Sequence, residues 1–256
     1  MDTVRYEALT LTLCEDDDTP SYTVTACDKA VKEVEIPLMV NGLPVTEIGD
    51  YAFQDCKELC TVTFPELTIE AVAEGAGIRR IGDHAFMGCV FLKRMDIPAT
   101  VSSVGWGCFH SCQRLKEVVA PSHTYFSGYA FAHCSALWSV TPLSTVSEGL
   151  FSHCVSLTTL PLTEDAEEIG EDGFENCAGL KRITIPASVT EIEALAFRGC
   201  ENLTHVTFAA PDGWYEVSSH YDKEGRLTLD DPQKNAKWLS EMDFDDGVIA
   251  WRRRKP

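Results

Sequence analysis

The sequence has no apolar run long enough to cross a membrane. No stretch of about 18 consecutive apolar residues occurs among its 256 residues, which excludes an ordinary transmembrane helix. A charged segment followed by an apolar core is also missing before residue 20, so we expect no secretory signal in this stretch. If the chain is complete, these two absences predict a cytoplasmic protein.

Basic residues are scarce relative to acidic ones. The chain has 21 Lys and Arg residues against 40 Asp and Glu residues, a formal net charge of −19. Such a surface repels the phosphates of nucleic acids, so we exclude nucleic acid as a partner and expect basic or neutral partners. The exception is Arg252-Arg-Arg-Lys255. This basic run could touch phosphate or a cell-wall polymer, but we interpret it as a solvated terminal tail.

The usual catalytic signatures are missing as well. The sequence has no Gly-x-Ser-x-Gly, no His-Glu-x-x-His and no glycine-rich loop of the kind that cradles phosphate. Its paired carboxylates, Glu167-Glu168 and Asp245-Asp246, fall in apparent turns, where solvated charge is the default. We therefore expect a protein that is not an enzyme and needs no cofactor.

What the sequence does contain is repetition. The phrase Phe-x-x-Cys-x-x-Leu occurs seven times, and successive copies begin 33, 23, 22, 20, 23 and 23 residues apart. The copies begin at Phe53, Phe86, Phe109, Phe131, Phe151, Phe174 and Phe197. All but the first spacing fall in the range of leucine-rich repeats. The long first step contains an insertion, Leu67 to Gly77, which we expect to form a protruding loop.

Each copy contains two short extended segments. The first, such as Leu180 to Ile185, alternates apolar and polar residues like a strand with one buried face. Proline stops this segment where its missing N–H would break a longer ladder. The prolines concerned are Pro98, Pro121 and Pro186. The second segment ends in Ile-Gly or Val-Gly, as at Ile169-Gly170, where the chain should turn.

An Ala-Phe pair, such as Ala85-Phe86, follows the turn in most copies. It would place one large ring and one small residue of each copy in the interior. No copy can cover this apolar face alone. We therefore predict stacked coils, about 4.8 Å apart, that cover one another and need a cap at each end.

The combined pattern Ile-Gly-x-x-Ala-Phe-x-x-Cys-x-x-Leu-x-x-Ile-x-Ile-Pro resembles the BspA-type leucine-rich repeat, common in surface proteins of bacteria. The resemblance covers residues 21 to 208. It implies a leucine-rich repeat solenoid, mostly β, with short strands and turns in each coil, and a cell-surface or secreted location. Ser127 and Ser147 replace the turn glycine, and Leu157-Thr-Thr-Leu-Pro-Leu departs from the strand pattern. We expect locally bent coils at these positions.

The repeats are flanked by two different ends. We divide the chain into an N-terminal capping hairpin with a half-repeat (1–47), seven repeats (48–208) and a C-terminal cap (209–256). In the first part, alternating residues in 1–13 and again in Ser21 to Cys27 predict a hairpin that closes one end of the stack.

The C-terminal cap should combine a hairpin with a helix. Trp214 to Val217 and Arg226 to Leu229 flank a turn at Asp222-Lys-Glu-Gly225, which predicts the hairpin. A short helix should follow from about Pro232 to Glu241, because Asp231 can cap it and proline suits its first position. A last apolar piece, Val248 to Trp251, precedes the basic tail.

Seven of the eleven cysteines hold one position in the repeat. They are Cys56, Cys89, Cys112, Cys134, Cys154, Cys177 and Cys200. We expect a ladder of buried, reduced thiols whose S–H groups serve turn carbonyls, since parallel side chains have poor geometry for bridging. The sequence also allows a disulfide between Cys14 and Cys27 across the first hairpin.

Two histidines next to ladder cysteines raise the question of a metal. His133-Cys134 and His153-Cys154 occupy the same place in neighbouring repeats, and two imidazoles with two sulfurs would suit zinc. The simpler interpretation is an exposed turn histidine beside an inward cysteine. We assign no metal site and keep a metal enzyme at these residues as the third hypothesis.

The outward strand positions form the best candidate binding surface, because a solenoid presents them in register. They are Arg94, Asp96, Glu117, Val119, Trp138, Ser139, Thr141, Arg182, Thr184, His205 and Thr207. Trp138 stands out, since Trp is enriched in interface hot spots. Taken singly, each of these residues is at least as well explained as a solvent-exposed strand residue with no binding role.

These observations predict a non-catalytic binding module that recognises another protein or a component of the cell envelope or host. The alternative is a structural spacer or adhesion stalk without a dedicated ligand. The sequence also allows self-association of the protein through an exposed strand edge.

Overall fold

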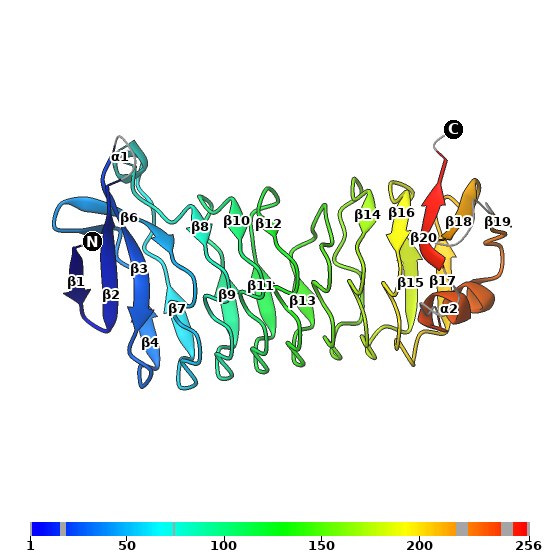
Figure 1. Cartoon of the computed structure of the whole chain (residues 1–256), viewed down its shortest axis with the longest axis horizontal. Coiled ribbons are helices and arrows are strands. Elements are labelled where there is room, and N and C mark those ends of the chain that lie inside the picture. The colour runs from blue at the N-terminus through cyan, green and yellow to red at the C-terminus, as the bar shows by residue number, and fades with distance from the viewer. Residues whose placement is uncertain (1, 16–18, 74, 219–224, 242–247, 255–256) are drawn as a thin grey trace. The chain divides into compact units, whose positions relative to one another are not determined.

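Each predicted repeat folds into one coil of a leucine-rich repeat solenoid, and neighbouring coils within each unit stack on one another (Figure 1). The computed structural model describes residues 2–15, 19–73, 75–218, 225–241 and 248–254. The chain divides into two units, residues 1–134 and 135–256.

The first unit begins with a cap of three strands, β1 (Thr3–Tyr6), β2 (Leu9–Cys14) and β3 (Ser21–Cys27). The predicted hairpin is confirmed, because β2 and β3 pair antiparallel. The single strand expected in residues 1–13 is instead two strands, which pair antiparallel with each other. The chain reverses between them at Glu7, whose φ of 49° lies in the left-handed region.

One face of the first unit is a parallel ladder that continues from β3. Its next strand is β6, and each later coil adds one strand that ends at the predicted Ile-Gly or Val-Gly turn or its equivalent. These strands are β6 (Leu43–Ile48), β8 (Arg80–Ile81), β10 (Ser103–Val104) and β12 (Tyr125–Phe126), and β5 (Met39–Val40) folds back on β6.

A second face carries the strands that end before the prolines. The strands β4 (Glu33–Glu35) and β7 (Thr61–Thr63) pair in parallel, and so do β9 (Arg94–Asp96) and β11 (Glu117–Val119). Pro98 and Pro121 follow the second pair as predicted. In β9, Met95 is buried and its two neighbours are exposed, the alternation of a strand with one wet face.

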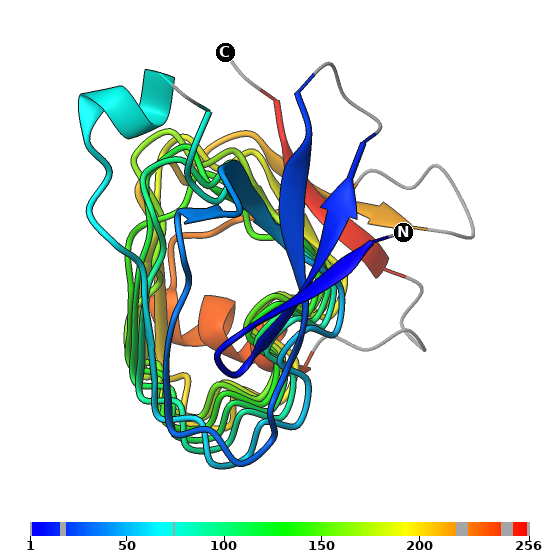
Figure 2. The same ribbon diagram turned by 90° about the vertical axis from the view of Figure 1, so that its left-hand side faces the viewer.

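The insertion that starts at Leu67 contains a helix, α1 (Ile69–Ala73), where a plain loop was predicted. The helix projects from the outline of the coils (Figure 2). Its fourth residue, Val72, is half exposed, whereas the chain returns to the core at Ala76 and Ile78, which are buried. Thr68 caps the helix by accepting a hydrogen bond from the Ala71 N–H at 3.2 Å.

The second unit repeats the two-faced plan. Its strands are β13 (Ser139–Val140), β14 (Glu168–Ile169), β15 (Arg182–Ile185), β16 (Glu191–Glu193) and β17 (His205–Phe208). The pairs β14 with β16 and β15 with β17 are parallel. Glu168 therefore lies in a strand and not in the turn that the sequence suggested.

The departures from the repeat pattern have different consequences. The Ser127 N–H donates to the Val104 carbonyl at 2.9 Å, the same bond that the Gly105 N–H makes to Ile81 at 2.8 Å, so the turn is kept without glycine. The fifth repeat is altered more. No strand forms around Pro161, and a single bridge joins Leu143 to Leu162, because proline has no N–H to continue a ladder.

The C-terminal cap contains the predicted helix, α2 (Pro232–Glu241), capped by Asp231 Oδ1, which accepts bonds from two N–H groups of its first turn. Its hairpin is only partly as predicted. Strand β18 (Trp214–Ser218) pairs antiparallel with β19 (Gly225–Arg226), which is two residues long. Most of the predicted turn, 222–224, lies outside the described residues.

Arg252 and Arg253 of the basic C-terminal run lie in a strand, which corrects its interpretation as a solvated tail, whereas Lys255 lies outside the described residues. Strand β20 (Val248–Arg253) lies between β16 and β18 and pairs antiparallel with both. Arg252 Nε donates to Glu191 Oε1 at 2.6 Å, and Arg253 Nη1 donates to the Ala187 carbonyl at 2.7 Å. The strand was missed because its charges suggested a tail, whereas carboxylates and carbonyls of the last coil compensate them.

The core of each unit is a column of the predicted phenylalanines, all with no exposed surface. In the first unit the ring centroids of Phe53 and Phe86 are 4.7 Å apart, and those of Phe109 lie 5.4 and 5.7 Å from Phe86 and Phe131. In the second unit Phe151, Phe174 and Phe197 follow at 5.4 and 5.3 Å. Neighbouring coils thus bury one another's aromatic rings, as the stacking argument requires.

Candidate functional site

In the first unit, the four predicted surface residues point outward from two paired strands. Arg94 lies opposite Glu117, and Asp96 lies opposite Val119. Arg94 binds both acidic neighbours, since Nε donates to Asp96 Oδ1 at 2.9 Å and Nη1 donates to Glu117. These charges compensate one another on the protein's own surface. An exposed ion pair of this kind contributes little energy, so this face has less to offer a partner than its composition suggested.

In the second unit, the remaining predicted surface residues also point outward. Arg182 lies opposite His205, and Thr184 lies opposite Thr207. Ser139 and Thr141 are half-buried beside Trp138, whose side chain is 56% exposed. Trp138 is therefore the exposed aromatic side chain among the predicted surface residues of this unit.

The first unit also contains a groove that the sequence did not predict. Strands β7 and β9 belong to different sheets, and no hydrogen bond joins the two strands, all of whose residues the structure describes. On the opposite face of the same coils, β6 and β8 remain paired. The insertion between the coils, Leu67 to Gly77, has therefore opened the stack on one face only.

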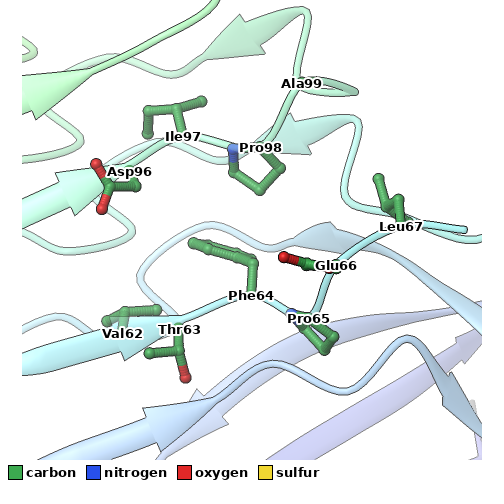
Figure 3. A pocket seen from close by; sticks show the side chains of 10 residues that line it. All are labelled: Val62, Thr63, Phe64, Pro65, Glu66, Leu67, Asp96, Ile97, Pro98 and Ala99. Carbon is green, nitrogen blue, oxygen red and sulfur yellow. The ribbon is translucent and has the colours of Figure 1, made fainter.

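This groove is mostly apolar and has a volume of about 570 Å³. Figure 3 shows Phe64 projecting from the β7 side toward Ile97 and Pro98 on the β9 side. The residues that line the groove are Val62, Thr63, Phe64, Pro65, Glu66, Leu67, Asp96, Ile97, Pro98 and Ala99. Its two charged residues are both acidic. The only signal in the sequence was the long first spacing between repeats, which does not say which face opens.

The cysteine ladder explains where the thiols near the two histidines point. Cys134 Sγ donates to the Phe109 carbonyl at 3.1 Å, and burial raises its pKa to about 12. His133 has a φ of 60° in an exposed turn, and its ring lies 5.1 Å from that of His110. In the second unit, His153 Nε2 contacts the Asn176 amide at 3.2 Å. Among the described residues, no group of three or more His, Cys, Asp or Glu side chains could hold a metal ion.

Several carboxylates lie close together in the turns of the second unit, and among them the pKa of Asp172 is shifted most. Burial and the charges of Glu175, Glu171 and Glu148 raise the pKa of Asp172 to about 6, and Arg198 offsets only part of this. A carboxyl whose pKa is raised in the folded state binds protons more tightly there. Its contribution to stability is therefore lost as pH rises from about 4 to about 6.

We expect Asp172→Asn to stabilise the protein at pH 8 by about 1 kcal/mol, after a discount for solvent screening. Asparagine tolerates the left-handed φ of 53° at this position and removes the repelled charge. At pH 4.5 the gain should be much smaller, because Asp172 itself is mostly protonated. Urea unfolding at both pH values measures the difference. The control is Glu201→Gln, an exposed acid on the same unit, which should change neither value, and a loss of stability in Asp172→Asn at pH 8 would contradict the expectation.

Solved structures with the same fold support this architecture. A leucine-rich cell surface protein of Faecalibacterium prausnitzii is 27% identical, with a TM-score of 0.70 over 91% of this chain. The chain spans 62% of that protein's length. Leucine-rich repeat proteins of Bacteroides ovatus and of T. pallidum are each 22% identical, with TM-scores of 0.55 and 0.51 over 82% and 79% of this chain. This chain spans 62% and 91% of the lengths of these two proteins, and at this identity they show the fold alone.

A search of curated proteins found no match. No helix among the described residues is long and apolar enough to cross a membrane. The family model of the BspA type leucine rich repeat region matches six copies, over residues 27–146 and 139–219. Since these matches extend over most of the chain, the protein belongs to the BspA-type leucine-rich repeat family.

Proposed function

We propose that the protein is a non-catalytic recognition module that binds an extended segment of another protein, and that the groove of the first unit is its binding site. The observation that carries this proposal is the interrupted ladder between β7 and β9, which leaves two strand edges facing an apolar groove. The two strands remain too close for a further strand between them, so a bound segment would lie across the groove and be selected by its side chains.

The chemistry of the groove indicates which segment would fit. Phe64, Ile97 and Pro98 offer apolar contact for one bulky side chain of the partner. Of the charged residues of the lining, Asp96 is already paired with Arg94 and Glu66 remains, and the whole chain carries a net charge of −19. A Lys or Arg next to the bulky residue would therefore be favoured. Leucine-rich repeat proteins commonly mediate protein interactions, and the F. prausnitzii neighbour is described as a cell surface protein, which makes a protein of the cell surface or host a fitting source.

A photo-crosslinking amino acid at Ala99 tests this assignment. Ala99 lines the groove and is exposed, and it follows Pro98 as the exposed Ala187 follows Pro186 in the sixth repeat. With a photo-crosslinking residue at each position in turn, we expect the Ala99 protein to label a partner that the Ala187 protein does not. The protein mixtures to use are surface extracts of the producing cell and of its host.

Two further variants decide whether the groove itself binds. Ala99→Trp fills the groove and should weaken binding of the labelled partner at least tenfold, whereas Ala187→Trp should leave it unchanged. Trp138→Ala and Arg94→Glu test the outward strand faces in the same assay. If the two crosslinking positions label alike and neither tryptophan variant alters binding, the groove is not a recognition site, and a spacer or stalk becomes the better interpretation.

A further inference from the structure

Three cations lie close together where β9 and β11 begin in the first unit. Lys93 comes directly before β9, and Lys116 comes directly before β11. The Lys116 N–H donates to the Lys93 carbonyl at 2.9 Å, so the two residues hold the same position in neighbouring coils, whose strands are about 5 Å apart. Both residues are exposed. Two positive charges therefore lie side by side on a chain whose net charge is −19.

The third cation, Arg114, is held beside the lysines by an aromatic ring. Arg114 lies two residues before Lys116, and Phe91 lies two residues before Lys93. The guanidinium carbon of Arg114 is 4.2 Å from the centroid of the Phe91 ring. A guanidinium over a ring face keeps the N–H groups at its edge for other acceptors. The contact therefore brings the Arg114 charge toward the coil that carries Lys93.

Within the part of the chain that the structure describes, none of these three cations forms an ion pair or donates a side-chain hydrogen bond. The acidic residues in the two strands, Asp96 and Glu117, are both bound to Arg94. Every other arginine of the first unit binds a carboxylate or a backbone carbonyl. These pairs are Arg5 with Asp28, Arg79 with the Gly75 carbonyl, and Arg80 with Glu47 and Asp50.

We propose that Lys93, Arg114 and Lys116, which we call the basic cluster, bind a sulfated polysaccharide. Three cations on two neighbouring coils favour a partner whose negative charges are as closely spaced. A sulfated polysaccharide carries several sulfate groups on two adjacent sugars, whereas a polymer of uronic acids has one carboxylate on each. The N–H groups of arginine and lysine donate charge-assisted hydrogen bonds to such anionic oxygens.

An acidic segment of a protein fits the basic cluster less well. Strands β9 and β11 pair with each other beside it, so they offer an extended peptide no free edge between them. A polysaccharide needs no such edge. The basic cluster is also separate from the groove, since none of its three residues is part of the groove lining.

The net charge of −19 is compatible with this partner. At physiological ionic strength, exposed charges more than about 8 Å apart are largely screened from one another. A sulfate group at the basic cluster therefore interacts mainly with the three cations. Asp96 and Glu117 lie closer than most acidic residues, but Arg94 compensates their charges.

Heparin, a highly sulfated polysaccharide, is the probe that tests this proposal. We expect the full chain to bind a heparin oligosaccharide in a calorimetric titration, and to bind the chemically desulfated oligosaccharide, which keeps its carboxylates, about tenfold more weakly or worse. The triple variant Lys93→Ala, Arg114→Ala and Lys116→Ala should weaken heparin binding by about tenfold or more. Raising NaCl from about 0.15 M to about 0.5 M should weaken it in the parent, because salt screens the contacts.

Lys181→Ala is the matched control. Lys181 precedes β15 as Lys93 precedes β9, and the Thr204 N–H of the next coil donates to its carbonyl at 2.9 Å. Thr204 and Asn202 stand where the basic cluster has its other two cations. Lys181→Ala should therefore leave heparin binding unchanged.

Several results would overturn the proposal. They are the absence of heparin binding, equal binding of the desulfated oligosaccharide, an unchanged affinity in the triple variant, and equal weakening by Lys181→Ala. Displacement of heparin by polyglutamate at the same concentration of negative charge would also overturn it, because an acidic protein segment would then be the better partner. Ala99→Trp, which fills the groove, should leave heparin binding unchanged, so this proposal and the proposed function can fail separately.

Discussion

Replacing Gly105 by alanine should destabilise the first unit by about 3 kcal/mol or more. A Cβ at this position would lie 2.3 Å from Asp83 Oδ1, 2.6 Å from the Asp83 backbone N and 2.6 Å from the Gly82 carbonyl carbon. Two of these three atoms are backbone of the coil before, so a side-chain rotation cannot relieve the overlap. The coils would have to separate at the turn where the Gly105 N–H donates to the Ile81 carbonyl at 2.8 Å.

Two control variants distinguish this overlap from other effects. Ser127 occupies the same turn position in the next repeat, and Ser127→Ala should change stability by less than about 0.5 kcal/mol. Gly42 has a φ of +80° with nothing within 4 Å of an added Cβ, so Gly42→Ala should cost only the strain of a left-handed residue, about 1 to 2 kcal/mol. Chemical unfolding followed by circular dichroism gives all three values. If Gly105→Ala and Ser127→Ala have the same midpoint denaturant concentration, the close approach of the coils does not determine which residues position 105 tolerates.

The repeat architecture could be predicted because equivalent positions in successive coils have the same requirements for burial and backbone conformation. A position that holds Phe, Cys or Leu in one coil faces its equivalents in the next, so burial is visible as a period in the sequence. Even the left-handed turns follow this rule. The second residue after each phenylalanine of the repeat has a φ between 56° and 72°, and all but one of these positions hold Asp, His, Asn or Gly, which tolerate that region best.

The groove and the C-terminal strand could not be predicted in the same way. The insertion at Leu67 fixes the length of chain between two coils, but only the packing of the coils decides which face loses its ladder. Strand β20 pairs with β16, far away in the sequence, and its arginines become acceptable because Glu191 and the Ala187 carbonyl lie beside them. Neither the opening of the groove nor the pairing of β20 recurs from repeat to repeat, so neither is visible as a period in the sequence. Both depend on a single contact between distant segments, and the functional sites we propose depend on contacts of the same kind.

The column of aromatic rings allows a second test, because Phe109 lies in its middle in the first unit. Phe109→Ala should cost about 4 kcal/mol, the range for a fully buried Phe with cavity formation. Its ring is parallel within 6° to both Phe86 and Phe131, so the substitution removes two ring contacts and leaves a gap in the column. The effect should exceed that of Phe53→Ala, since no other ring of the column precedes Phe53.

A matched control lies close by in the sequence. Phe91 is half-buried at the surface, where Arg114 lies 4.2 Å from its ring centroid, and Phe91→Ala should cost about 1 kcal/mol or less. Thiol labelling adds a local readout, because Cys134 donates to the carbonyl of Phe109 and is fully buried. In Phe109→Ala this thiol should react many times faster than in Phe91→Ala. A cost near 1 kcal/mol for both variants, with equal labelling, would mean that the coils do not depend on one another's rings, and the stacking argument would have to be abandoned.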